Sequence, residues 1–150
     1  MSINNDINQQ NFKSEHQRAT INLIYTYNWI TERLKAIFDK EGLTMQQFNI
    51  LRILRGSDKP LSTLQIRERM LDKMSDTSRI VDRLLIKGLV KKVVCKADKR
   101  LVDVTITEIG RALLQNIDLQ EAEMDAIMEP LSKEEALTLN TLLDKIRRSN

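Results

Sequence analysis

The sequence has few of the residues that disulfide frameworks, many-turned folds and membrane spans require. Its 150 residues include one cysteine, four glycines and two prolines. The single Cys95 excludes an internal disulfide and a multi-cysteine zinc site. So few glycines and prolines favour helices joined by short turns over a many-stranded sandwich or barrel. No run of about 18 apolar residues is present, so we expect no transmembrane segment.

Other features that would indicate secretion, metal binding or catalysis are also missing. Residues 1–17 are polar and rich in Asn and Gln, and they lack the basic start and apolar stretch of a secretory signal. The lone His16 lies in or near this polar tail, and no spacing of His, Asp and Glu indicates a metal site. The sequence shows no grouping of a nucleophile, a base or metal ligands of the kind that an active site requires. We therefore expect a cytoplasmic protein that has no cofactor or bound metal and is not an enzyme.

Charge is unevenly distributed along the chain. From Lys59 to Arg100 there are 12 Lys and Arg against 5 Asp and Glu, a net charge of +7. The rest of the chain carries 12 against 16, a net charge of −4, and together they give the overall +3. A basic middle third indicates a polyanionic partner, although a cluster of charge is often just a solvated face.

The first part of the chain has the periodicity of helices. Leu23, Tyr27, Ile30, Leu34 and Ile37 share one face of a helix predicted from about residue 17 to residue 40. Gly42 suits a left-handed C-terminal cap, and Thr44 suits the N-cap of a second helix. After the turn at residues 56–60, Ser62 and Gln65 form a capping box that opens a short third helix.

The middle and end of the chain combine helices with one hairpin. Ser75 is the expected N-cap of a fourth helix, with Asp76 in its first turn and Gly88 at its end. Residues 89–95 and 102–106 read as two paired strands. A long helix from about Thr107 to Pro130 follows, and then a last helix opened by a capping box at residues 132–135. The predicted fold is mainly α (α+β), with about six helices and one β-hairpin.

Two short helices followed by a basic hairpin indicate a winged helix-turn-helix, which binds DNA by placing the start of its second helix in the major groove. Ser and Thr hydroxyls and Arg guanidinium groups read base edges there. The candidate residues of this recognition helix are Ser75, Thr77, Ser78, Arg79 and Arg83. The hairpin tip offers Lys96, Lys99 and Arg100 to phosphates or to the narrow minor groove. The role of Asp82 is ambiguous: it could pair with Arg79, Arg83 or a neighbouring arginine, and a structural role is expected.

The stretch from Ser78 to Gly110, SRIVDRLLIKGLVKKVVCKADKRLVDVTITEIG, resembles regulators of the multiple antibiotic resistance regulator (MarR) family. The matching pieces are SRIVDRL, KGLV, the Asp98-Lys99-Arg100 wing motif and TITEIG. Helix order and chain length also match from about Gln17 to Arg148. The resemblance implies one domain, residues 1–150, with a winged helix-turn-helix core at about 44–107. Dimerisation helices at about 17–40 and 107–148 would form a homodimer.

The resemblance also implies a function. A two-fold dimer would bind double-stranded DNA at a pseudo-palindromic operator, with Arg100 of the wing in the minor groove and Asp98 orienting it. Lys99 stands where many members of the family carry a second arginine. We expect a repressor, released by a small aromatic effector bound in a cleft. Candidate lining residues are Tyr25, Trp29, Phe38 and Phe48. Of the five aromatic residues in the first two helices, which are these four and Tyr27, at least half are expected to be core.

Two alternatives stay open at this point. The winged helix could be a protein-interaction module without specific DNA binding, although its basic wing and recognition helix favour DNA. Cys95 could be redox-active, because a cation beside it at Lys96 lowers the pKa of a thiol, but an ordinary strand cysteine is the expected role.

Overall fold

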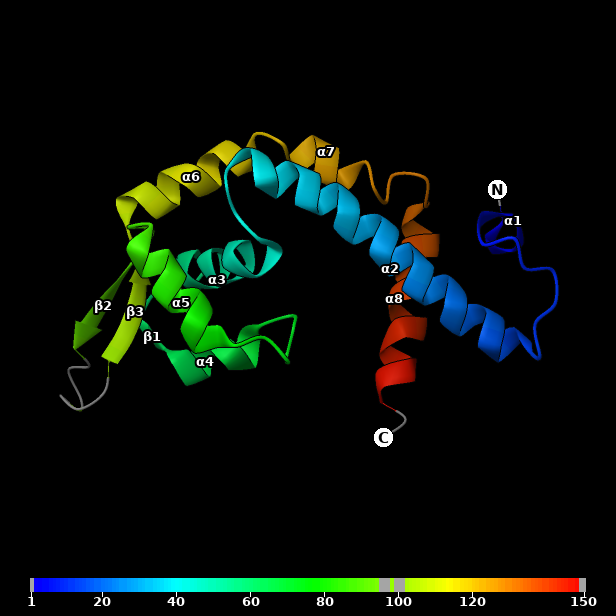
Figure 1. Cartoon of the computed structure of the whole chain (residues 1–150), viewed down its shortest axis with the longest axis horizontal. Helices are drawn as coiled ribbons and strands as arrows, with labels where there is room; N and C mark the ends of the chain where they lie inside the picture. The colour runs from blue at the N-terminus through cyan, green and yellow to red at the C-terminus, as the bar shows by residue number, and fades with distance from the viewer. Residues whose placement is uncertain (1, 95–97, 99–101, 149–150) are drawn as a thin grey trace. The chain divides into compact units, whose positions relative to one another are not determined.

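The computed structural model describes residues 2–94, 98 and 102–148 (Figure 1). The chain divides into two compact units, residues 1–36 and residues 37–150. Among the described residues, no helix is long and apolar enough to cross a membrane.

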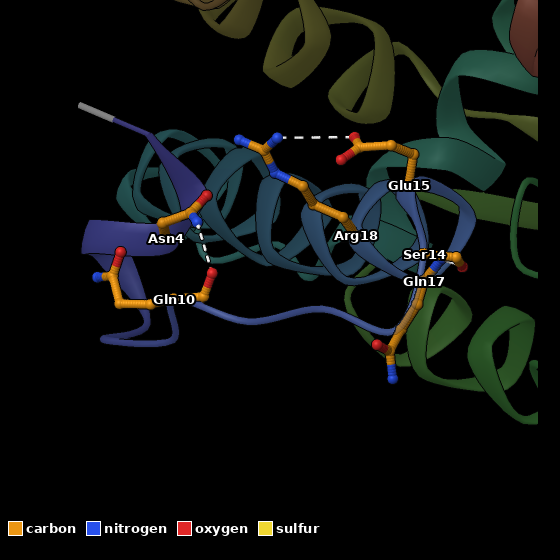
Figure 2. A network of polar contacts seen from close by, with 6 residues as sticks. All are labelled: Asn4, Gln10, Ser14, Glu15, Gln17 and Arg18. Atoms are coloured by element: carbon orange, nitrogen blue, oxygen red, sulfur yellow. Dashed lines mark hydrogen bonds and ion pairs between the residues drawn. The ribbon is translucent and has the colours of Figure 1, made fainter.

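The first unit contains a short helix, α1 (Ile3–Asp6), and most of α2 (Glu15–Lys40). Ser14 Oγ accepts the Gln17 N–H at 3.1 Å, and Gln17 Oε1 accepts the Lys13 N–H at 2.8 Å, so side chains satisfy donors at the start of α2. Figure 2 shows Ser14 and Gln17 at the start of α2 and, apart from them, a hydrogen bond from the Asn4 amide to the Gln10 carbonyl, 3.4 Å long. The sequence did not predict α1, because its polar residues carry no apolar periodicity.

The helix predicted at residues 17–40 is confirmed as α2, which begins two residues earlier than expected. Its buried residues are Ile37 and Phe38, both near its C-terminal end. Leu23 and Tyr27, on the predicted apolar face, are exposed. The N-terminal part of that face is therefore uncovered, whereas Ile30 and Leu34 are half-buried.

The second unit is built from six further helices and a small sheet. The elements are α3 (Met45–Arg55), β1 (Leu61–Ser62), α4 (Thr63–Arg69), α5 (Thr77–Ile86), β2 (Val90–Val94), β3 (Val102–Ile106), α6 (Glu108–Asp118), α7 (Glu121–Asp125) and α8 (Lys133–Arg147). The sheet is antiparallel with strand order β1-β3-β2. Val104 of β3 pairs with Leu61 on one side and with Lys92 on the other. The mainly helical fold with one hairpin is confirmed.

Helix ends lie close to where the sequence predicts them. Thr44, Ser62 and Ser132 each cap a helix through a complete capping box. Gly42 and Gly88 have φ of +67° and +70°, the left-handed conformation expected of residues that end helices. Short-range polar chemistry therefore sets most boundaries in this fold.

The core of the second unit lies where α3, α4, α5 and α6 meet the sheet. Each helix contributes apolar side chains at helical spacing, and the sheet contributes alternate residues. The most deeply buried include Ile50, Leu51, Ile66, Leu84, Val104, Leu114 and Ile117. In Figure 1, α3 and α5 lie next to the sheet, and α5 packs against both α3 and β2.

Two parts of the fold differ from the prediction. The long helix expected from Thr107 to Pro130 is broken into α6 and α7, and at the break the Gln120 N–H binds the Ile117 carbonyl, three residues back, at 2.8 Å. No glycine or proline marks this break in the sequence. Strand β1 was also missed, since two residues are too few to show alternation.

Candidate nucleic-acid interface

Helix α5 has one buried and one exposed face. Thr77, Val81 and Leu84 are spaced by four and three residues and point into the core. Ser78, Arg79 and Arg83 are exposed and occupy other positions around the helix. Its N-cap is Asp76, whose Oδ1 accepts the Arg79 N–H at 3.2 Å. The expected N-cap, Ser75, is wrong by one residue.

Ser75 has a different structural role. Its hydroxyl donates to the Asp72 carbonyl at 2.8 Å, and Asp72 Oδ1 accepts the Met74 N–H at 3.0 Å. Lys73 donates to the carbonyl of Glu68 at the end of α4. These bonds order the turn between α4 and α5, because each ties a side chain to nearby backbone.

The five predicted residues of the recognition helix are not all on one surface. Ser78, Arg79 and Arg83 are exposed, and Ser75 is half-buried. Thr77 is only 3% exposed, and its hydroxyl has no hydrogen-bond partner among the described residues. The prediction that Thr77 contacts a base edge is therefore wrong, because its side chain is the first on the buried face of α5.

Arg79 is held only loosely. Its Nε lies 3.6 Å from Asp76 Oδ2, and both side chains are largely exposed. Exposed ion pairs contribute about 0–1 kcal/mol, so this pair can separate at little cost. Arg79 and Arg83 are thus available to an anionic or base-edge partner.

The wing is joined to α5 through an ion pair that the sequence did not predict. Lys92 of β2 lies 3.2 Å from Asp82 of α5, so within the described part of the chain Asp82 pairs with a lysine and not with Arg79 or Arg83. Lys91, also on β2, is exposed. Both lysines belong to the basic middle third, and that clustering of charge is the signal that could have found them. Of the wing tip, Asp98 is half-buried; Cys95, Lys96, Lys99 and Arg100 lie outside the described residues.

A second lysine ties the C-terminal end of α5 to the rest of its unit. Lys87, the C-cap of α5, donates from Nζ to the Gly42 carbonyl and to Gln47 Oε1, the latter at 3.3 Å. Gln47 is buried and also closes the capping box of α3. The C-terminal end of α5 is therefore fixed to the segment around the start of α3 by polar contacts.

The four predicted effector residues fall into two pairs. Phe38 and Phe48 stack with ring centroids 4.2 Å apart, and Phe38 is buried, so this pair is part of the core of the second unit. Tyr25 and Trp29 belong to the first unit and are partly exposed. The Arg33 guanidinium lies 3.5 Å from the centroid of the Trp29 ring, a cation–π contact.

Among the described residues, no cluster of three or more His, Cys, Asp or Glu side chains is placed to hold a metal ion.

Comparison with known proteins identifies the family. Residues 41–101 match the model of the MarR family. The transcriptional regulator MhqR of Bacillus subtilis is 30% identical over 122 residues, covering 80% of this chain and 83% of that protein. The chain belongs to the MarR family. PecS of Dickeya dadantii, another transcriptional regulator, is 29% identical over 79% of this chain and 74% of its own length.

Solved structures agree on the fold. A MarR mutant from E. coli in complex with operator DNA has a TM-score of 0.78 at 21% identity, over 91% of this chain and 99% of that one. BpsR of Bordetella bronchiseptica has a TM-score of 0.78 at 22% identity, over 94% and 100% of the two chains. Members of the MarR family related to this chain are DNA-binding transcriptional regulators rather than enzymes. The protein is therefore a MarR-family winged-helix regulator.

Proposed function

We propose that this protein is a sequence-specific transcriptional repressor that binds a pseudo-palindromic operator as a homodimer. The observation that carries the proposal is the exposed face of α5, with Ser78, Arg79 and Arg83 on a helix that Asp76 caps at its start and Lys87 ties to the Gly42 carbonyl at its end. Rigid placement matters because base readout needs donors held in a definite position relative to the groove. In the proposal, residues 44–107 contain the DNA-reading core.

The exposed apolar surface of the helices outside this core supports a dimer. Helix α8 buries none of its residues and exposes Leu137, Leu142 and Ile146. Large exposed apolar surface on a soluble domain commonly marks a protein interface, and a second copy of the same chain can cover it in a symmetric dimer. Residues 17–40 and 107–148 are the proposed dimerisation helices. Sedimentation equilibrium should give a dimer, and Leu142→Glu should weaken it.

The proposal includes release of the protein from its operator by a small aromatic effector. DNA binding by the structural relative BpsR is regulated by 6-hydroxynicotinic acid. A ligand of this class would release DNA from the present protein only if it bound the non-binding conformation more tightly. Trp29 is the only tryptophan in the chain, so its fluorescence reports directly on ligands near α2. Titrating 6-hydroxynicotinic acid while recording that fluorescence and the DNA anisotropy tests this step.

The test of DNA readout begins by selecting a duplex from a random pool with the full chain. Arg79→Ala and Arg83→Ala should each weaken binding of the selected duplex by about 5- to 150-fold, corresponding to about 1–3 kcal/mol for a base-reading arginine. Lys13→Ala removes one charge from an exposed position outside the proposed interface and serves as the matched control. Unchanged affinity in both arginine variants would contradict the proposal and favour a protein-interaction role. Transcription of a reporter behind the selected duplex then distinguishes repression from activation.

A further inference from the structure

The turn between α4 and α5 exposes two large apolar side chains beside the proposed DNA-reading helix. Met74 is 93% exposed and Leu71 is 80% exposed. Met74 lies two residues before the N-cap Asp76, so its Cα is within about 8 Å of that residue's Cα. Figure 1 shows this turn extending beyond the ends of the two helices that it joins.

The turn is ordered even though these side chains make little contact with the protein. Asp72 accepts the Met74 N–H through its side chain and the Ser75 hydroxyl through its carbonyl. Lys73 is engaged by the end of α4. The polar side chains of the turn are thus used internally, and the apolar ones are turned outward. This arrangement costs solvation free energy unless a partner covers Leu71 and Met74.

We propose that Leu71 and Met74 contact the C5-methyl groups of thymines in the major groove. The proposal rests on the proposed function, since it places these side chains next to the helix that reads the operator. Thymine is the base that presents an apolar group at the major-groove edge, and apolar side chains recognise it there. Met74 precedes Ser78 and Arg79 by only four and five residues in the chain, and this nearness to the proposed DNA-reading residues favours DNA as the occupant over a protein partner. Met74 and Leu71 are then specificity determinants for A·T pairs beside the bases read by α5.

The test compares thymine with deoxyuridine, which differs only by the missing C5-methyl group. Each thymine of one half-site in the selected duplex is replaced singly, and binding is measured for the unsubstituted protein, Met74→Ala and Leu71→Ala. At one thymine or more, loss of the methyl group should weaken binding by the unsubstituted protein about fourfold, the value of one buried methyl-sized group. The same replacement should have no effect on the variant that has lost the contact.

Ile86→Ala is the matched control. Ile86 is 87% exposed at the opposite, C-terminal end of α5, so this variant should retain the full thymine–deoxyuridine difference. Thermal unfolding checks that all three variants fold, as expected for side chains with so little burial. A difference of equal size in the Met74 and Leu71 variants and in the unsubstituted protein would overturn the proposal. The proposal would also be overturned if Met74→Ala and Leu71→Ala lost affinity equally for selected and random DNA.

The proposed function and the thymine contact fail in different ways. If the unsubstituted protein binds selected and random duplexes equally, the proposed function fails and the thymine contact fails with it. If it prefers the selected duplex but shows no coupling between either apolar residue and a methyl group, only the thymine contact fails.

Discussion

Replacing Gly110 by alanine perturbs the point where α6 passes closest to the chain entering β2. An alanine Cβ would lie 2.3 Å from the Leu89 carbonyl oxygen and 2.8 Å from Ile106 Cγ1. Favourable carbon contacts lie at about 3.5–4.0 Å, so the helix or the chain entering β2 would have to move. The Leu89 carbonyl resists movement because it accepts the Thr107 N–H at 3.0 Å.

The expected loss of stability follows from two opposing effects. Overpacking costs about 1–3 kcal/mol, and obstruction by a backbone atom places Gly110→Ala in the upper half of that range. Alanine regains up to about 1 kcal/mol of helix propensity. The net destabilisation is therefore about 1–2 kcal/mol, which for a chain of this size lowers Tm by about 2–8 °C. Thermal and urea unfolding followed by circular dichroism measure it.

Gly56→Ala is the matched control. An added Cβ at Gly56 meets its nearest atoms at 3.5 and 3.9 Å, and φ there is −81°, which alanine adopts freely. This variant should be unchanged or slightly more stable. A Tm of Gly110→Ala that equals or exceeds the Tm of the unsubstituted protein and that of Gly56→Ala would show that α6 does not pass so close to Leu89.

Three further substitutions test polar contacts that hold this unit together. Thr107→Ala removes the N-cap of α6 and the hydroxyl bond to the Gly88 carbonyl, and should lower the free energy of unfolding by about 0.5–2 kcal/mol in urea; an unchanged urea midpoint would contradict it. Arg55→Ala removes a two-bond ion pair with Asp118, partly exposed, and should cost no more than about 1 kcal/mol, less at high salt; a cost that does not shrink with salt would argue against an ionic origin. Lys87→Met should cost about 1 kcal/mol and speed hydrogen exchange at the start of α3, whereas exchange unchanged there would show that the bridge does not stabilise α3.

Local chemistry made much of the fold predictable. The caps at Thr44, Ser62 and Ser132 depend on residues within a few positions of one another, so the sequence alone specifies them. The shift from Ser75 to Asp76 at the start of α5 could not be predicted in the same way. Both residues are good N-caps, and the choice depends on the hydrogen bond that draws the Ser75 hydroxyl back to Asp72.

Tertiary contacts account for the features that the sequence did not reveal. Strand β1 exists because β3 has a free edge beside Leu61, and the break between α6 and α7 coincides with a contact from Lys40 to Gln120 and Glu123. Thr77 is buried because of the orientation of α5 about its own axis where the helix packs on the core. Local periodicity carries no information on such long-range packing. The sequence could therefore place a candidate site on α5, but it could not show which residues of α5 are exposed.

The most direct test of the account is the ratio of affinities for selected and random DNA. Fluorescence anisotropy of the full chain, titrated into a labelled selected duplex and a shuffled duplex across a range of salt, gives that ratio. We predict a preference of at least about 10³ for the selected duplex, with affinity falling steeply as salt rises. A ratio near one at every salt concentration would contradict the claim that the exposed face of α5 reads DNA sequence.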